Sequence, residues 1–225
     1  MKRSDINKLL RDSVEFCTRM NFRLPPYAFW SPGEWRSKDS SYDSIRRKML
    51  GWDITDFGSG RFEELGLILF LLRCSEPRSS DLALSYAERV MIVSENQHIP
   101  FHFHKYKMED VVNRSGGNLM IQLYGSLPDG EFSGEDITIT QDGHTYSAPS
   151  GIIIRLTPGE SLTVPLMTYH SFWGEPGCGR VLAGEISNVS DPRTDNHFYD
   201  LSGRFPDIEE DELPLFLLST DYATA

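Results

Sequence analysis

The stretch Phe101-His-Phe-His-Lys-Tyr-Lys-Met-Glu109 carries the most informative pattern in the sequence. Side chains alternate between the two faces of a β-strand, so His102 and His104 project to one side, where both can reach a metal ion at about 2.0–2.2 Å. Glu109 follows at an odd interval, which on an unbroken strand would turn its carboxylate to the other face. Residues 105–108 are therefore expected to bend and to carry Glu109 onto a neighbouring strand.

A fourth candidate ligand, His170, lies in the apolar, strand-like residues 164–173, shortly after Pro165. A lone histidine in such a stretch needs a partner. A His-x-His pair is weak evidence by itself, because paired histidines on a strand are often surface or core residues. Three imidazoles and one carboxylate together form a site suited to a divalent transition metal, with positions left open for a substrate.

From Trp52 onward the sequence has the pattern of a β-rich body, with short apolar and β-branched runs separated by turn residues. Asp142-Gly143 is a two-residue hairpin signal between residues 137–141 and 144–147. No helix of ten or more residues is expected in this region, so the strands should pair antiparallel, as in a sandwich or barrel. The expected strands span residues 67–72, 89–93, 119–124, 137–140, 151–156 and 161–164.

Before residue 51 the pattern predicts helices. Apolar residues at helical spacing after Ser4 indicate an amphipathic helix over residues 5–20. Ser31-Pro32-Gly33-Glu34 has the residues of a capping box and opens a short second helix. A third helix is expected over about residues 42–50, ending at Gly51. We expect a single domain over residues 1–225, with a helical segment, residues 1–50, packed on a barrel and tail, residues 51–225.

Composition limits the partners and the location. The 225 residues carry 22 Lys+Arg and 33 Asp+Glu, a net charge of −11, which makes nucleic acid and anionic membranes poor partners. The amino terminus has no apolar signal region, and the longest apolar run, Leu67 to Leu72, is too short to span a bilayer. The three cysteines are far apart and form no CxxC pair, which favours a reducing, cytoplasmic compartment.

The spacing His102-x-His104-x4-Glu109-x6-Gly116, followed by a proline-containing strand with a histidine, resembles the two sequence motifs of the cupin superfamily. The resemblance implies a mainly β fold, the cupin double-stranded β-helix or jelly-roll barrel, with N-terminal α-helices. The family's second motif often reads Pro-x-Gly-x-x-His. Here Pro165 and His170 have the proline-to-histidine spacing without the glycine.

Longer stretches are similar to the D-lyxose isomerase family and are spread over most of the chain. The resemblance implies a manganese-dependent cupin, Mn²⁺ being its metal, that forms a homodimer. It also implies an enzyme acting on free aldose and ketose sugars, which interconverts D-lyxose and D-xylulose and often D-mannose and D-fructose. The similar stretches are residues 24–35, 101–109, 184–191, 194–196 and 203–211.

Aldose–ketose isomerisation moves a proton between adjacent carbons through a cis-enediol, which requires a carboxylate beyond the metal ligands. Glu185 is the best candidate for this base, since desolvation in its apolar segment would raise its pKa; the alternative is a place on the solvent face. Lys107 shares a face with Glu109 if both lie on one strand, and could then polarise a substrate oxygen; otherwise it is an exposed turn lysine. Asp195 and Arg204 could bond sugar hydroxyls, orient the base, or pair structurally in a closing loop.

Two other functions remain open for such a fold, because cupins host many activities. The same ligands could bind Fe²⁺ and activate O₂ in a dioxygenase. A non-catalytic sugar-binding cupin would hold a structural metal or none. A carboxylate that lies near the ion but is not one of its ligands distinguishes these functions, because the isomerase needs such a group and the other two do not.

Overall fold

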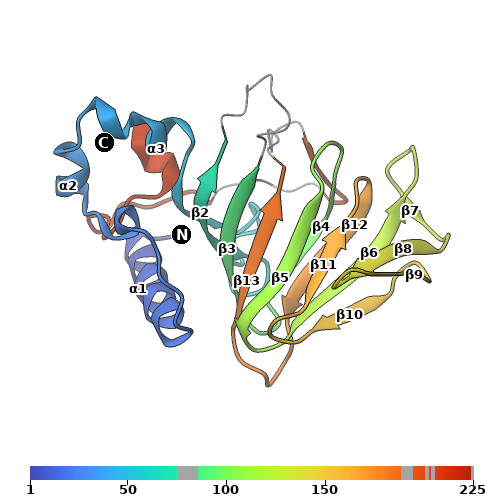
Figure 1. Ribbon diagram of the computed structural model, residues 1–225. Coiled ribbons are helices and arrows are strands. Elements are labelled where there is room, and N and C mark those ends of the chain that lie inside the picture. Colours follow the sequence, from blue (N-terminus) through green and yellow to red (C-terminus); the bar gives the residue numbers. More distant parts are fainter. Residues whose placement is uncertain (76–85, 189–194, 201–202, 204–205, 224–225) are drawn as a thin grey trace.

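The computed structural model describes residues 1–75, 86–188, 195–200, 203 and 206–223, and it shows helices on one side of two curved sheets (Figure 1). None of the helices within these residues is long and apolar enough to cross a membrane. The helices are α1 (Arg3–Arg19), α2 (Pro32–Arg36) and α3 (Asp43–Arg47), with 3-10 helices η1 (Pro26–Phe29), η2 (Ser40–Tyr42) and η4 (Ser219–Ala223).

The strands pair antiparallel in two sheets, as expected from the absence of crossover helices. The larger sheet has the order β1 (Gly51–Thr55), β2 (Leu67–Cys74), β3 (Ala87–Val93), β13 (Val181–Ser187), β5 (Glu109–Gly116), β11 (Ser161–Val164), β8 (Ile137–Gln141) and β9 (His144–Ala148). The smaller sheet has the order β10 (Ile153–Leu156), β6 (Leu119–Ser126), β12 (Thr168–Gly174), β4 (Ile99–His104) and β14 (Asn196–Phe198), with β7 (Phe132–Ser133) beside β6.

The main core lies between the two sheets and is built from every second residue of each strand. Val111 of β5 and Ala183 of β13 pack in one cluster with Ile121 of β6 and Phe172 of β12. Because side chains alternate along a strand, the residues two positions before Val111 and two after Ala183 share this inner face. The larger sheet therefore presents Glu109 and Glu185 to the interior. This mainly β architecture with N-terminal helices confirms the predicted fold.

Helix α1 covers the outer face of the larger sheet. Its apolar stripe, which includes the fully buried Ile6 and Leu10, packs in a second cluster with Phe70 and Val90 of the sheet. The helix begins earlier than expected, because Lys2 is the N-cap residue. Ser4 instead binds the tail: its hydroxyl donates a hydrogen bond to Asp211 at 2.7 Å.

Local turn signals predicted several shorter elements correctly. The capping box of α2 is present, with Ser31 Oγ accepting from Glu34 N and the Glu34 carboxylate accepting from Ser31 N. Asp142 and Gly143 have φ values of 49° and 81° and join β8 to β9 as a tight hairpin. The third helix is shorter than expected, because its last turn closes at Met49, which adopts φ 53°.

The two ends of the described chain meet on the helical side of the molecule (Figure 1). The amino group of Met1 donates to the carbonyl of Asp207 at 2.8 Å. The guanidinium of Arg3, a residue only 1% exposed, pairs with Glu210 at 2.6 Å and Asp221 at 3.1 Å. Residues after the last strand thus hold α1 in place.

Candidate metal centre and active site

Three histidines from the smaller sheet form a buried cluster. His102 and His104 lie on β4, and His170 lies directly opposite His102 on the neighbouring strand β12. Their ligand nitrogens are all within 4.8 Å of one another, and the three residues are between 0% and 8% exposed. These residues could hold a metal ion.

Backbone carbonyls set the orientation of two of the imidazole rings. His102 Nδ1 lies 2.9 Å from the carbonyl of Pro100, and His170 Nδ1 lies 3.1 Å from the carbonyl of Thr168. A carbonyl oxygen only accepts hydrogen bonds, so each Nδ1 carries the proton. Nε2 is therefore the nitrogen of each ring that remains to face the cluster and could bind a cation.

Glu109 faces the histidine cluster from the opposite sheet. The bend expected over residues 105–108 is present and delivers Glu109 to β5, which belongs to the larger sheet and is not paired with β4. Its Oε1 lies 3.0 Å from His170 Nε2, and its Oε2 lies 3.5 Å from His104 Nε2. One carboxylate and three imidazoles thus converge from the two sheets.

The protonation states of this cluster suit a cation. Burial, followed by the neighbouring His170 and His104, holds the pKa of His102 well below 6.5, so that ring is neutral. Burial alone would raise the pKa of Glu109, but the Lys107 ammonium and the two imidazoles beside it hold that pKa well below 4.5. Among the described residues, the buried Nε2 atoms of His104 and His170 have no well-formed hydrogen bond. Unsatisfied buried acceptors of this kind fit a metal ion.

Asp195 lies behind His104. Its Oδ2 is 3.6 Å from His104 Nδ1, and its Oδ1 accepts a hydrogen bond from the backbone N–H of Tyr106 at 2.6 Å. The residue is 0% exposed. Asp195 is therefore placed to orient a candidate ligand. Arg204, the other residue taken from the family-like tail, lies outside the described residues.

Glu185 lies on the inner face of β13, in the same charged cluster as Glu109. Its Oε1 accepts a hydrogen bond from Lys107 Nζ at 2.9 Å, another from Ser187 Oγ at 3.1 Å, and a short one from the guanidinium of Arg89. The expected increase in its pKa is wrong. Burial does raise it, but the two cations, Arg89 first, outweigh burial and hold the pKa below 4.5.

Lys107 bridges the two buried carboxylates. Its Nζ lies 2.5 Å from Glu109 Oε2 and 2.9 Å from Glu185 Oε1, and its side chain is 7% exposed. The residue lies in the bend before β5, not on the strand. The ammonium nevertheless faces the interior, and the alternative of an exposed turn lysine is excluded.

Sequence reasoning missed Arg89 and Ser187. Arg89 pairs directly with Glu185 in the register between β3 and β13. A signal was present, because the alternation along β3 places Arg89 on the same face as the core residues Met91 and Val93. A cation on the core face of a strand requires a buried acid nearby.

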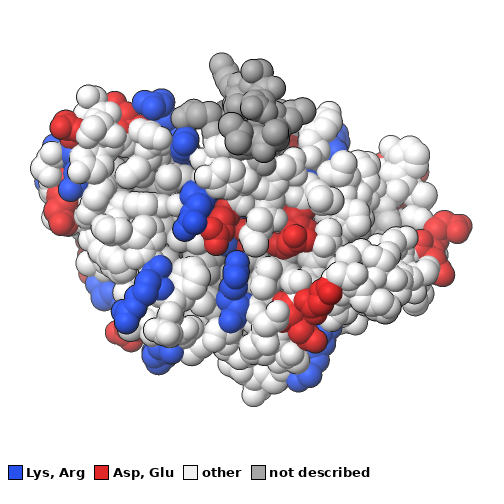
Figure 2. All heavy atoms as spheres, viewed as in Figure 1, with Lys and Arg blue, Asp and Glu red and all other residues white. Residues whose placement is uncertain are grey.

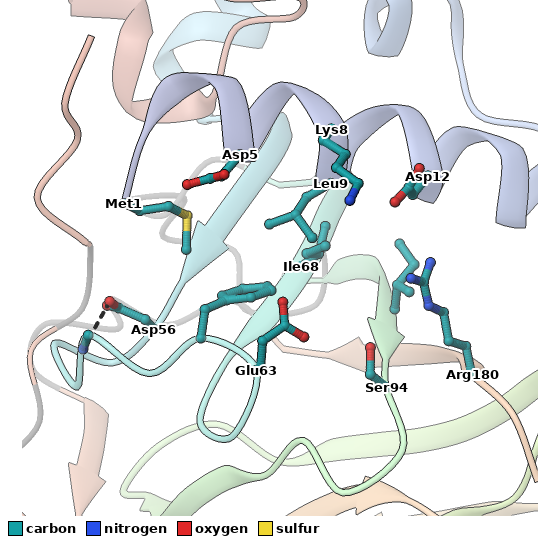
Figure 3. Close-up of a pocket in the computed structure, with 13 residues that line it drawn as sticks. Met1, Asp5, Lys8, Leu9, Asp12, Asp56, Glu63, Ile68, Ser94 and Arg180 are labelled. Carbon is teal, nitrogen blue, oxygen red and sulfur yellow. Dashed lines mark hydrogen bonds between the residues drawn. The ribbon is translucent and has the colours of Figure 1, made fainter. Parts of the chain in front are cut away.

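A pocket of about 500 Å³ lies elsewhere, between α1 and the outer face of the larger sheet (Figure 3). Lys8 and Asp12 of α1 line one wall, and Ile68 and Ile92 belong to the sheet. These isoleucines pack in the outer cluster, while the candidate metal ligands lie on the inner side of the sheets. The pocket is therefore separate from the histidine cluster.

The outer surface carries charges of both signs. Acidic and basic side chains are interspersed on the face shown in Figure 2, and neither sign forms an uninterrupted patch there. Glu88, on the outer face of the larger sheet, lies 3.4 Å from Arg73 and 3.9 Å from Arg114. The conspicuous charge cluster of the molecule is instead the buried one around Lys107.

Two antiparallel sheets that enclose a histidine and carboxylate centre have the architecture of the cupin barrel that the sequence predicted. A sequence model of the D-lyxose isomerase family matches residues 1–222. The chain is also 41% identical over 223 residues to the D-lyxose/D-mannose isomerase of Serratia proteamaculans, a match that covers 99% of this chain and 98% of the relative. The corresponding enzyme of Escherichia coli O157:H7 is 40% identical with the same coverage. The chain belongs to the D-lyxose isomerase family, which confirms the predicted aldose–ketose isomerase.

Solved structures of L-ribose isomerases share the fold. The enzyme of Acinetobacter sp. DL28 in complex with L-ribose has a TM-score of 0.62 at 13% identity, over 90% of this chain and 94% of that one. The ligand-free enzyme of Cellulomonas parahominis has a TM-score of 0.62 at 14% identity, over 93% and 98% of the two chains. The likeness extends over nearly the whole chain.

Proposed function

We propose that this chain is a divalent-metal-dependent isomerase of free sugars, which interconverts D-lyxose and D-xylulose and also D-mannose and D-fructose. The names of the two relatives at 41% and 40% identity support this choice of substrates. One observation carries the reaction type: a second buried carboxylate, Glu185, lies beside the candidate ligand Glu109 and shares Lys107 with it. A dioxygenase or a binding protein has no need of such a group.

In this proposal His102, His104, Glu109 and His170 hold Mn²⁺. The ligand set suits manganese and related divalent ions, and the buried Nε2 atoms without partners support a cation at this place. When bound, the ion supplies Lewis-acid stabilisation of the charge that develops on the substrate oxygens. Asp195 Oδ2 lies 3.6 Å from His104 Nδ1, which is longer than a hydrogen bond, and in this proposal it would orient the ring of His104 when the ion is bound.

Glu185 acts as the base. It removes the proton from the carbon beside the sugar carbonyl and returns it to the adjacent carbon, through a cis-enediol. Because Arg89 and Lys107 hold its pKa below 4.5, the carboxylate is ionised at neutral pH, but it is also a weak base. A base this weak requires an acidified substrate carbon, which explains why the reaction needs the ion as well.

The remaining site residues bind and orient the substrate. Lys107 donates a hydrogen bond to a substrate oxygen as negative charge develops there, since its ammonium already lies between the two carboxylates. Arg204 binds sugar hydroxyls. The support for Arg204 is its place in the family-like stretch of residues 203–211.

The proposed state of the enzyme is a cytoplasmic homodimer without nucleic-acid or membrane partners. The dimer is supported by the family resemblance. The reducing compartment is supported by Cys17, Cys74 and Cys178, which are far apart in the sequence and form no disulfide among the described residues.

The test combines metal analysis with an isotope experiment. We expect the purified protein to contain a divalent metal and to form ketose from D-lyxose and D-mannose within a panel of free aldoses. In D₂O, deuterium at C1 of the ketose supports the proton-transfer route. Glu185→Gln should keep the metal and lose turnover, whereas the matched change Glu88→Gln, on the outer face of the same sheet, should leave turnover unchanged.

Three outcomes would contradict the proposal. Oxygen consumption during turnover would indicate a dioxygenase. Sugar binding without turnover by the metal-loaded protein would indicate a binding cupin. Near-normal turnover by Glu185→Gln would remove Glu185 as the base.

A further inference from the structure

The two oxygens of the Glu185 carboxylate differ in the hydrogen bonds that they accept. Three donors converge on one of its oxygens, Oε1: the guanidinium of Arg89, Lys107 Nζ at 2.9 Å and Ser187 Oγ at 3.1 Å. The other oxygen, Oε2, accepts no hydrogen bond from any residue that the structure describes.

We propose that Arg89 and Ser187 are positioning residues, which anchor Oε1 of Glu185 so that Oε2 alone transfers the proton. The inference rests on the proposed function, since it assigns the geometry of the base in that reaction. It adds two residues to the site and specifies which atom of Glu185 faces the substrate.

The anchors come from rigid parts of the fold. Arg89 stands opposite Glu185 in the β3–β13 register, and Ser187 lies two residues further along the same strand, on the same face. The Arg89 side chain is 24% exposed and that of Glu185 is 8% exposed. Hydrogen bonds between ionised groups that are mostly buried are stronger than hydrogen bonds between neutral groups, and they fix the acceptor in one orientation. Both oxygens of an unanchored carboxylate would instead exchange places by rotation.

Charge balance explains why Arg89 is needed in addition to Lys107. Arg89 and Lys107 contribute two positive charges, and Glu109 and Glu185 contribute two negative charges. Without Arg89, two buried carboxylates would share one ammonium. The repulsion between the two carboxylates would then be only half compensated, and Glu185 would lose the anchor that sets its rotamer.

The experiment compares Arg89→Ala, Arg89→Lys and Ser187→Ala with the parent enzyme, all loaded with manganese. General-base catalysis contributes about 10²–10⁴-fold, so a misplaced base should lower kcat by about 10- to 100-fold in Arg89→Ala, with KM and metal content little changed. Ser187→Ala, which removes one neutral donor, should lower kcat by about fivefold. Arg89→Lys should recover part of the loss, because it restores the charge without the planar fork.

Chemical rescue separates positioning from a general structural role. Guanidinium ion at a non-denaturing concentration should restore part of the activity of Arg89→Ala, but none of that of Glu185→Gln, which lacks the base itself. Arg114→Ala is the matched control, since Arg114 is on the outer side near Glu88. It should keep the parent kcat and show no response to guanidinium.

Several results would overturn the inference. A kcat for Arg89→Ala within about twofold of the parent, or a loss that appears only in KM, would show that Arg89 does not position the base. If Arg89→Ala fails to fold or to hold metal, a normal kcat in both Ser187→Ala and Arg89→Lys would overturn it. A parent enzyme that isomerises no aldose would overturn the proposed function first, so the two failures are distinguishable.

Discussion

Asp195 Oδ2 lies 3.6 Å from Nδ1 of His104, the nitrogen on the far side of the ring from the atom that faces Glu109. The two residues are brought together because β14, which begins just after Asp195, pairs with β4. A carboxylate behind a ligand histidine fixes the ring and raises its basicity. The relationship therefore connects the tail of the chain to the candidate metal centre.

Asp195→Asn should weaken metal binding without removing a ligand. Loss of such a carboxylate typically costs about 10–100-fold in metal affinity, which titration calorimetry with Mn²⁺ would measure. The exposed Asp136→Asn serves as the control and should bind with parent affinity. Equal affinities for Asp195→Asn and the parent would remove the orienting role.

Removal of the metal should abolish turnover and lower the melting temperature together. An ion at 100 times its dissociation constant stabilises the folded state by about 2.7 kcal/mol. In calorimetric scans a chelator should therefore lower Tm, and the later addition of Mn²⁺ should restore it. His102→Ala should show the low Tm with or without Mn²⁺. Parent-like metal content in that variant would refute the ligand assignment.

Gly116→Ala should destabilise the protein. Gly116 has φ +93°, and an added Cβ would lie 2.3 Å from the carbonyl oxygen of Arg180. The left-handed conformation alone costs a non-glycine residue about 1–2 kcal/mol, and the clash adds to this cost. Urea unfolding should show the sum as a lower free energy of unfolding. Gly134→Ala is the control, because no atom of the described residues beyond its two chain neighbours lies within 4 Å of its added Cβ. A difference near zero between the two variants would contradict the prediction.

Leu10→Ala should loosen the helix from the sheet. Leu10 is 0% exposed within the outer cluster, and leucine truncations in cores cost about 2–5 kcal/mol. The exposed neighbour Lys8→Ala should change the free energy of unfolding by no more than about 0.5 kcal/mol. Chemical denaturation of both variants measures the contrast, and comparable losses would show that α1 is not held by its apolar stripe.

The ion pair between Arg3 and Glu210 should make stability depend on acid pH. The hydrogen bond that the Glu210 carboxylate accepts from Arg3 holds the pKa of Glu210 below 4.5. Since the folded pKa is depressed, the contribution is complete above pH 4.5 and is lost as the pH falls through the lower folded value. Glu210 is 56% exposed, so the contribution is small, well under about 1 kcal/mol. Urea unfolding at a series of pH values measures how the free energy of unfolding changes with pH. Glu210→Gln should weaken this dependence below pH 4.5, and an unchanged dependence would contradict the role of Glu210.

Strand alternation and turn chemistry predicted what is local in this molecule. The pairing of His102 with His104, the bend before Glu109 and the hairpin at Asp142 all depend on nearby residues only. The same logic explains why the capping box at Ser31 was predicted correctly.

Contacts between distant segments were beyond that reasoning. The pKa of Glu185 was expected to rise because the segment around it is apolar, yet its partner Arg89 comes from a strand far away in sequence. The start of α1 was misplaced because Ser4 binds Asp211 at the other end of the chain. Which distant segments become neighbours decides both results, and no local pattern specifies that.

The meeting of the two chain ends has a consequence for biosynthesis. Helix α1 leaves the ribosome about 200 residues before its partners do, because Arg3 and Asn7 bind residues 210–221. Until then the nascent chain exposes an apolar stripe and a cation destined for burial. Helix α1 can therefore dock fully only after residues 210–221 have been made, and deletion of residues 210–223 should make α1 more sensitive to proteases.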